Sequence, residues 1–316
     1  MDAAAIDQIR LNFNAQAIIG LNVVIGLMML GVSLDLKLDD FKRIVLSPRA
    51  PGVGLVAQFI FLPAFTFLLT LILPITPSMA LGMILIAACP GGNLSNIMTY
   101  LARGNAAVSI SMTAVSTAAA VFMTPLNLAV WGSLNPATDS ILRRVSLNPL
   151  DVFTTIFIIL GVPLVTGMLL SRFFPSLADK IRKPFKIFSF LVFIGFVGAA
   201  LGANWQIFLK VIGLVVFGVF IHNALALSLG YWSGRLLGLE KRDVRAVSIE
   251  VGIQNSALGL ILIFNFFEGL GGMAIVAAWW GIWHIIAGLS VATFWSRRPL
   301  PGDPEGHSRQ AMLIKT

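Results

Sequence analysis

The sequence Cys89-Pro-Gly-Gly-Asn-Leu-Ser-Asn96 interrupts a long apolar stretch in the first half of the chain. A second polar interruption, Glu250-Val-Gly-Ile-Gln-Asn-Ser256, lies within an apolar stretch of the second half. Inside a bilayer every backbone N–H and C=O needs a partner, so such a break is tolerated only where it is buried in protein or lines a cavity. One break in each half is typical of a transporter built from repeats, with its binding site where the broken helices meet.

The composition places this chain in a lipid bilayer. It has 316 residues, of which 57% are hydrophobic and 11% charged, and its mean hydropathy is +0.90. No soluble domain of this size needs that much apolar surface. The net charge of +8 does not indicate a nucleic-acid partner, because the Lys and Arg residues lie in short segments between apolar stretches, where they set the topology.

Apolar stretches long enough to span a bilayer predict about nine transmembrane helices. They lie near 17–34, 50–73, 79–101, 106–131, 152–171, 186–203, 208–232, 245–267 and 273–296. Basic residues gather in every second connecting segment, namely 35–49, 101–105, 172–186, 233–245 and the residues after 296. The positive-inside rule therefore predicts a multi-pass protein of the inner (plasma) membrane, with its N-terminus outside and its C-terminus in the cytoplasm.

The two broken helices run through the membrane in opposite directions, which predicts an inverted repeat whose first half lacks its first helix. Residues 1–16 are expected to lie on the extracellular or periplasmic side, and they show no removable signal peptide. Residues 17–296 are expected to form the transmembrane domain. Residues 297–316 are polar and proline-rich, so we expect a disordered cytoplasmic tail.

Glu250 is the residue that most strongly suggests a function. A carboxylate inside a membrane is costly and indicates a functional site by default. The alternative is that Glu250 reaches the cytoplasmic surface or pairs with Arg245. The Gln254 side chain and the freed carbonyls of Val251 and Ile253 add neutral oxygens beside it. Carboxylate, amide and carbonyl oxygens together suit a hard cation such as Na⁺.

Polar side chains of the first half could face the same site. Ser95 and Asn96 belong to the first break, and Ser109 and Thr113 lie one turn apart on one face of the next helix. An isolated hydroxyl in a membrane helix more often bonds its own backbone or assists helix packing. Gln58, alone among apolar neighbours, fits an interhelical contact and an amide ligand equally well.

The remaining intramembrane polar residues give weaker signals. His222-Asn223 and His284 could be proton sites, although such a histidine is more often a neutral residue satisfied by a neighbouring helix. No Gly-x-Ser-x-Gly elbow, His-Glu-x-x-His motif or Walker loop occurs, so the sequence does not predict an enzyme. Without a nucleotide site, transport would be driven by an ion gradient.

Both breaks and their surroundings resemble the bile acid:sodium symporter family. The segments that carry the resemblance are Cys89–Asn96, Tyr100–Asn105, Ser109–Thr117 and Ser248–Ser256. The resemblance extends from about residue 17 to residue 296, and the motifs are specific only in combination. It implies a panel domain, about 17–34 and 152–203, and a core domain, about 50–131 and 208–296, in which two discontinuous helices cross. Animal sodium/taurocholate cotransporters of this family have nine helices, whereas bacterial members commonly have ten.

The same resemblance implies two sodium sites. The first would take Ser95, Asn96, Ser109, Thr113 and Glu250. The second would take Gln58, Gln254, Glu250 and the carbonyls of Val251 and Ile253. On the substrate side the chain departs from the family, because many members have His-Asn where this chain has His284-Ile285, and bacterial relatives often have Thr at the position of Asn93.

An organic anion is the expected substrate, because two Na⁺ ions beside one carboxylate leave local positive charge. The N-termini of the half-helices would add backbone N–H donors for a carboxylate. The substrate-binding residues that we expect are Gly92, Asn93, Asn255, Ser256 and His284. The sequence thus predicts Na⁺-coupled symport of a bile-acid-like anion or small carboxylate by alternating access. The alternatives are a proton-coupled or exporting carrier of the same fold, and a non-transporting membrane receptor or scaffold.

Overall fold

The computed structural model describes residues 15–36, 38–145, 149–203, 205–298 and 300. Within these ranges the regular structure is helical, apart from one isolated β-bridge between Gly91 and Gln254. Five of the described helices are long and apolar enough to cross a membrane: Arg49–Ile72, Ala106–Leu134, Leu150–Phe173, Val215–Leu236 and Gly271–Ser296. The predicted class, an all-helical protein of the membrane, is confirmed.

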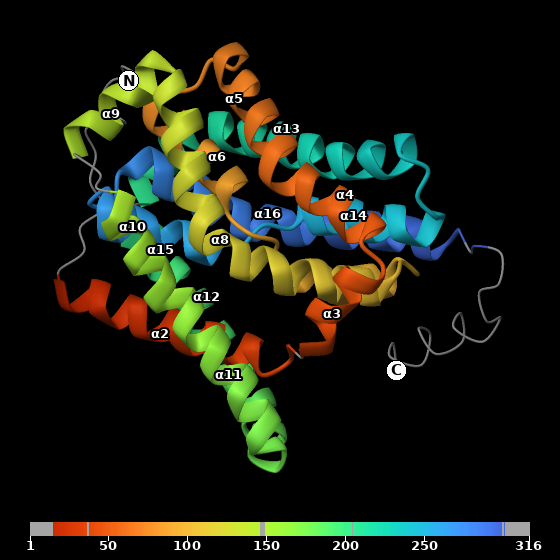
Figure 1. The fold of residues 1–316 in the computed structure, drawn as a ribbon. Helices are drawn as coiled ribbons and strands as arrows, with labels where there is room; N and C mark the ends of the chain where they lie inside the picture. Colours follow the sequence, from red (N-terminus) through yellow and green to blue (C-terminus); the bar gives the residue numbers. More distant parts are fainter. Residues whose placement is uncertain (1–14, 37, 146–148, 204, 299, 301–316) are drawn as a thin grey trace.

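The helices follow the predicted apolar stretches closely (Figure 1). In chain order they are α2 (Ala15–Ser33), α3 (Leu38–Leu46), α4 (Arg49–Val56), η1 (Ala57–Phe61), α5 (Leu62–Ile72), α6 (Pro77–Ala88), α7 (Leu94–Leu101), α8 (Ala106–Leu134), α9 (Pro136–Val145), α10 (Pro149–Ile156), η2 (Phe157–Gly161), α11 (Val162–Phe173), α12 (Pro175–Ala203), α13 (Trp205–Leu236), α14 (Lys241–Gly252), α15 (Ser256–Phe266) and α16 (Gly271–Ser296). The stretches 79–101 and 245–267 are each a pair of half-helices, α6 with α7 and α14 with α15.

The segments expected to be connections contain more helix than the sequence predicts. The basic segment 172–186 is largely the first part of α12, and the segments 35–49 and 132–151 contain the short helices α3 and α9. Hydropathy marks where a helix leaves the apolar region, whereas a charged sequence can continue the helix beyond it. The predicted terminal segments 1–16 and 297–316 lie almost wholly outside the described residues.

Two helices contain a π-helical turn near their middle, and a proline explains each one. The turns are η1 and η2, and Pro63 and Pro163 follow them within two residues. A proline cannot donate to the residue four positions earlier, and its ring crowds that carbonyl, so the preceding turn widens. The first of these turns carries Gln58, which is buried.

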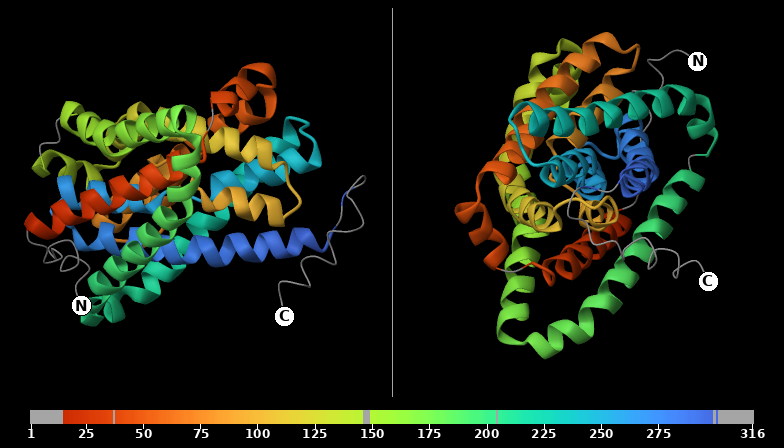
Figure 2. Two further views of the ribbon diagram at one scale, coloured as in Figure 1. Left: turned by 90° about the horizontal axis from the view of Figure 1, so that it is seen from below. Right: turned by 90° about the vertical axis from the view of Figure 1, so that its right-hand side faces the viewer.

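The helices form two groups. Helices α2, α11 and α12 pack against one another, and we call them the three-helix layer. Figure 2 shows α11 and α12 meeting at an edge of the molecule, on the side of α2. The other group, which we call the main bundle, consists of α4–η1–α5, α6, α7, α8, α13, α14, α15 and α16. The half-helices α6 and α15 are buried along almost their whole lengths, so the two breaks lie inside protein.

Glycines allow the closest helix approaches in the main bundle. A Cβ at Gly230 of α13 would lie 2.7 Å from both the Ser248 Cα and the Val247 carbonyl oxygen of α14. A Cβ at Gly82 of α6 would lie 2.8 Å from the Met273 Cα of α16. Small residues let membrane helices pack backbone against backbone, so α13 lies close against α14 and α6 lies close against α16.

A reciprocal amide pair joins the three-helix layer to the main bundle. Asn22 of α2 donates to Asn265 Oδ1 of α15 at 3.0 Å, and the Asn265 amide donates back to Asn22 Oδ1 at 2.8 Å. Further along α2, the Met29 sulfur accepts from the Asn255 amide at 3.8 Å. Helix α2 is therefore the part of the layer that packs against α15.

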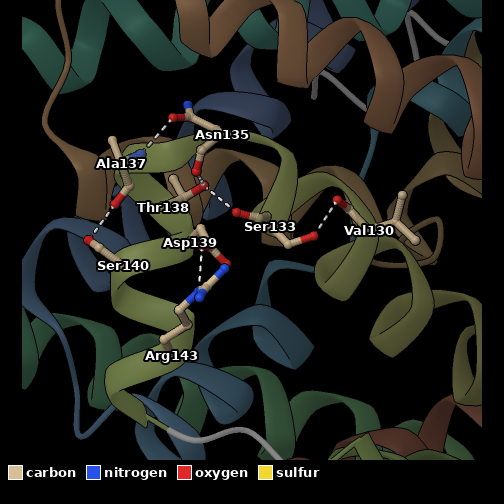
Figure 3. A network of polar contacts seen from close by, with 9 residues as sticks. Val130, Ser133, Asn135, Ala137, Thr138, Asp139, Ser140 and Arg143 are labelled. Carbon is tan, nitrogen blue, oxygen red and sulfur yellow. Dashed lines mark hydrogen bonds and ion pairs between the residues drawn. The ribbon is translucent and has the colours of Figure 1, made fainter.

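A polar network shapes the corner between α8 and α9 (Figure 3). Asn135 Oδ1 accepts from Ala137 N at 3.0 Å, which caps the start of α9. Thr138 donates to the Gly132 carbonyl at 2.5 Å and so fixes the direction in which α9 leaves α8. On the exposed face of α9, Ser140 donates to the Ala137 carbonyl at 2.8 Å. The corner is thus held by local bonds and offers an exposed side chain at Ser140.

Candidate functional site at the crossing of the two broken helices

The two breaks lie against each other and supply backbone partners for one another. Gly92 N donates to Ile253 O at 2.6 Å, and Asn255 N donates to Pro90 O at 2.9 Å. These bonds accompany the isolated β-bridge between the breaks. The two discontinuous helices therefore cross at their breaks, and backbone groups freed inside the membrane are satisfied by protein.

Side chains satisfy the last carbonyls of α6 at the first break. Gln58 Nε2 donates to Cys89 O at 2.9 Å, from the π-helical turn η1. Thr124 of α8 donates to Ala88 O at 2.8 Å. A helix end leaves carbonyls without intrahelical partners, and burial makes their satisfaction obligatory. These two bonds therefore allow α6 to end in the middle of the protein.

The second break is satisfied in a similar way. Asn223 Nδ2 of α13 donates to Gly252 O at 2.7 Å. Gln254 Nε2 donates back to Val251 O at 2.7 Å. Ser256 N, which would bond Gly252 O in an uninterrupted helix, donates to Gln254 O at 3.0 Å. The backbone groups named here therefore each have a hydrogen-bond partner where the chain passes from α14 to α15.

Glu250 lies at the centre of the crossing and is 0% exposed. Its Oε2 accepts from Ser95 Oγ at 2.5 Å and from Ser109 Oγ at 2.7 Å. Its Oε1 accepts from Thr113 Oγ1 at 2.6 Å. The alternative that Glu250 reaches a membrane surface is therefore wrong. The hydroxyls come from α7 and α8, so the carboxylate draws three helices together.

The remaining member of the first expected sodium set lies in the same cluster. Asn96 Oδ1 accepts from Thr113 Oγ1 at 3.3 Å. Thr99, which the sequence analysis did not single out, donates to Ser109 Oγ at 3.3 Å. The five side chains implied by the family resemblance are thus brought together, with Thr99 behind them.

The expected second sodium set gathers around two glutamines. Gln58 Nε2 donates to Gln254 Oε1 at 2.7 Å, and Gln254 Nε2 donates to Gln58 Oε1 at 3.2 Å. Both glutamines are almost fully buried. The Val251 and Ile253 carbonyls lie in the same short segment, and they accept the bonds from Gln254 and Gly92 described above. All members of this set are therefore at the crossing.

This donor set fits an alkali cation better than a transition metal. Every expected ligand atom is an oxygen, from a carboxylate, hydroxyls, amides or carbonyls, and hard cations prefer oxygen. A hydroxyl that donates to Glu250 still has lone pairs with which to accept a cation. Among the described residues no three His, Cys, Asp or Glu side chains gather in a way that could hold a metal ion.

The expected substrate residues border the crossing but differ in surroundings. Gly92 and Asn93 are half-buried at the start of α7. Asn255 caps α15, because its Oδ1 accepts from Leu258 N at 3.1 Å. Ser256 and His284 are buried. The structure thus gives Asn255 a definite structural role as a helix cap, in addition to any contact with a substrate.

His284 lies on a face of α16 that passes the crossing. On this face, a Cβ at Gly281 would lie 3.0 Å from the Ser256 hydroxyl, and one at Gly288 would lie 2.8 Å from Ile253 Cδ1. His284 falls between these two glycines at helical spacing. His222, by contrast, bonds Thr66 through Nε2 at 2.8 Å and packs against Trp280, while its buried Nδ1 has no hydrogen-bond partner among the described residues.

A second contact joins the two broken helices at their far ends. Arg245 of α14 donates to Ala102 O and to Arg298 O, each at 2.7 Å. Asn105, in the turn between α7 and α8, donates to Asp243 Oδ1 at 2.8 Å. The half-helices α7 and α14 are therefore fastened together both at the breaks and at their other ends.

Comparisons with known proteins agree with this geometry. The sequence model of the Sodium Bile acid symporter family matches residues 22–211. The uncharacterized sodium-dependent transporter YocS of Bacillus subtilis is 32% identical over 88% of this chain and 83% of its own length. The probable sodium/metabolite cotransporter BASS1, chloroplastic, of Oryza sativa is 33% identical over 90% of this chain and 67% of its length.

More distant matches include the P3 protein of Mus musculus, which is 29% identical over 72% of this chain and 47% of its length. This chain spans about two thirds of the chloroplast proteins that it matches, between 65% and 67% of their lengths. The family model covers more than half of the chain, and it includes the first break, the polar face of α8 and the three-helix layer. This chain therefore belongs to the sodium bile acid symporter family, a family of transporters and not of enzymes.

Proposed function

We propose that this protein is a secondary active transporter that couples the inward movement of Na⁺ to symport of an organic anion. The observation that carries the proposal is the Glu250 carboxylate, which is 0% exposed at the crossing and accepts hydrogen bonds from three hydroxyls. A buried charge without a full counter-charge destabilises the protein, and a cation bound at this position would offset the free energy of burying it.

Two sodium sites would share this carboxylate. The first would use Glu250 with the Ser95, Asn96, Ser109 and Thr113 side chains, and the second would use the Gln58 and Gln254 side chains with the Val251 and Ile253 carbonyls. Two cations beside one carboxylate leave a net charge of one, which attracts an anion. The anion would bind beside Gly92, Asn93, Asn255, Ser256 and His284, at the N-terminal ends of α7 and α15.

Alternating access would use the two groups of helices. In this proposal the three-helix layer, together with α10 and η2, would serve as the panel domain, and the main bundle would serve as the core domain. The bundle holds both breaks, so it would move as a unit against the layer, as in other transporters with crossing broken helices. The Asn22–Asn265 pair and the Met29–Asn255 contact join α2 to α15, so such a movement would have to break or shift them.

The orientation that we propose has the N-terminus outside and about nine spans in inverted repeats. The support is the distribution of Lys and Arg in the sequence. Basic residues gather in every second connecting segment, so these segments all fall on one side of the membrane. With Cys89 replaced by serine, a cysteine at exposed Ser140 should react with an impermeant thiol reagent added outside intact cells. A cysteine at Ser176, at the start of α12, should react only after permeabilisation. Reaction of both from the same side would contradict the topology.

Coupling between the ion and the anion is the central test. We expect Na⁺ to raise the thermal unfolding temperature, and a screen of bile acids and small carboxylates in sodium chloride and in choline chloride should find anions that stabilise the protein mainly when Na⁺ is present. Calorimetry of such an anion should show affinity gains equal in both directions, on the order of 1–3 kcal/mol. Equal anion affinity in both salts would contradict coupled binding.

The same measurements separate the alternatives. A proton-coupled carrier would bind its anion equally well in sodium and choline salts, with a dependence on pH instead. A receptor or scaffold without transport would bind Na⁺ or anion without accumulating the anion in proteoliposomes that carry a sodium gradient.

A further inference from the structure

We propose that Asn223 is a positioning residue that holds the second break in its ion-binding shape by fixing the peptide group of Gly252. The inference rests on the proposed function, because it concerns the site that would hold the second sodium ion. Asn223 is not one of the expected ion ligands. It would act through the backbone between two of them.

The amide of Asn223 bonds the last carbonyl of α14. Asn223 is 1% exposed, and its Nδ2 donates to Gly252 O at 2.7 Å. In a continuous helix this carbonyl would accept from Ser256 N, but that group donates to Gln254 O. The Asn223 amide therefore replaces the intrahelical partner that the break removes.

Expected sodium ligands lie on either side of this carbonyl. Val251 and Ile253, whose carbonyls are the expected backbone ligands, flank Gly252 directly. A glycine permits its adjacent peptide groups to rotate more freely than any other residue. Rotation of the Gly252–Ile253 peptide would change the orientation of the neighbouring carbonyls relative to each other. A hydrogen bond to Gly252 O opposes this rotation and so holds their relative orientation.

Close packing of α13 against α14 allows a side chain as short as asparagine to reach this carbonyl. Helices α13 and α14 pack closely along their length, and a Cβ at Gly252 would overlap the Leu227 side chain of α13. Glycine at this position thus has two consequences. The absence of a side chain lets α13 approach the break. The freedom of the glycine backbone means that a hydrogen bond from α13 is needed to hold the break in one conformation.

The first break shows the same arrangement with a different residue. There the helix that precedes the broken pair also carries a buried amide, Gln58, which donates to Cys89 O at the end of α6. In each half, therefore, the preceding helix binds a terminal carbonyl of the first half-helix. Gln58 also contacts Gln254, whereas the Asn223 amide group bonds the backbone carbonyl of Gly252. Replacing Asn223 therefore tests the positioning of the backbone carbonyls without removing an expected side-chain ligand of Na⁺.

The experiment measures Na⁺ affinity of the purified full-length protein by thermal unfolding and by calorimetry, so it does not depend on an identified anion. Asn223→Leu keeps the branched shape without the N–H donor, and Asn223→Ser leaves a hydroxyl too short to reach. We expect each variant to bind Na⁺ roughly fivefold to tenfold more weakly, the change typical of one lost hydrogen bond. If Asn223→Leu does not fold, Asn223→Ser provides the comparison.

The matched control is Ser248→Ala. Ser248 of α14 donates to Leu227 O of α13 at 2.8 Å, so it joins the same two helices by a similar bond one turn before the break. Its removal should leave Na⁺ affinity unchanged within about twofold, since the Ser248 hydroxyl bonds Leu227 O, which is not an expected ligand. If Ser248→Ala weakens Na⁺ binding as much as the Asn223 variants do, general packing between α13 and α14 explains the effect and the proposal is wrong.

A double-mutant cycle adds a readout that a merely structural role would not change. Asn223→Ser combined with Gln254→Ala should be non-additive in Na⁺ affinity, because both act on the second site. Combined with Ser109→Ala, in the first site, the departure from additivity should be smaller, because the two sites meet only at Glu250. Additivity in both cycles would overturn the proposal. If the unmodified protein shows no Na⁺ response, the proposed function fails; if it responds and the Asn223 variants respond equally, this inference fails alone.

Discussion

Replacing Glu250 by glutamine should abolish the Na⁺-dependent stabilisation of the protein while leaving the fold intact. The substitution keeps the shape of the side chain but removes the charge that offsets the bound cations. An ion pair separated by about 4 Å is worth roughly 4 kcal/mol at an effective dielectric constant near 20. Loss of that attraction corresponds to about a thousandfold weaker binding per ion.

The fold should survive because the partners of Glu250 can adapt. The Ser95, Ser109 and Thr113 hydroxyls now donate to the carboxylate, and a hydroxyl can instead accept from an amide by rotating. The measurement is the unfolding temperature across a titration of sodium chloride at constant ionic strength. Asp243→Asn is the matched control, since it neutralises a carboxylate on the same helix, where Asp243 bonds Asn105 outside the site. Wild-type Na⁺ dependence in Glu250→Gln would show that Glu250 is structural and that the site assignment is wrong.

Replacing Gly91 by alanine should also weaken ion binding strongly, although Gly91 is not itself an expected ligand. A Cβ at this position would overlap the Glu250 carboxylate. The side chain would have to leave its three hydroxyl partners, and hydrogen bonds to a charged group are worth about 1.5–3 kcal/mol each. Displacement from even one of them would weaken Na⁺ binding at least about tenfold, and displacement from two about a hundredfold or more.

The comparison variant for this prediction is Gly52→Ala. Gly52 lies in α4, and a Cβ there would meet no atom within 4 Å, so alanine should leave both Na⁺ affinity and stability unchanged or slightly raise stability. Isothermal titration of Na⁺ to both variants measures the difference. If Gly91→Ala binds Na⁺ like the unmodified protein, the carboxylate has room to move within the crossing, and its contacts with the hydroxyls do not determine affinity.

The sequence predicted the helices and the centre of the site for a physical reason. A carboxylate and a Pro-Gly-Gly break are so unfavourable in hydrocarbon that their presence requires an explanation. This reasoning found Glu250 and both breaks. The i, i+4 pair of Ser109 and Thr113 was found because spacing alone fixes the helix face on which both lie.

Other parts of the site could not be recognised from the sequence. Thr124 and Asn223 bond backbone carbonyls far from them in the chain. Asn223 was noticed beside His222, but its role, like that of Thr124, depends on which carbonyl the fold brings to it. The π-helical turn that directs Gln58 toward the break is better marked, because Pro63 follows it within the same helix. The helical extension of α12 was missed because hydropathy reports the apolar part of a helix and not its charged continuation.

The bridge between Gly91 and Gln254 also constrains how the protein can be made. The two residues are 163 positions apart (254 minus 91), and a ribosome adds about 5–20 residues each second. For roughly 10–30 s of synthesis, the amide of Gly92 and the carbonyl of Pro90 exist without the partners that they have in the finished protein. The first half of the chain is consequently not a module that can complete its own structure in lipid. Insertion of the first broken helix into a dry interior has to wait for the second half to emerge.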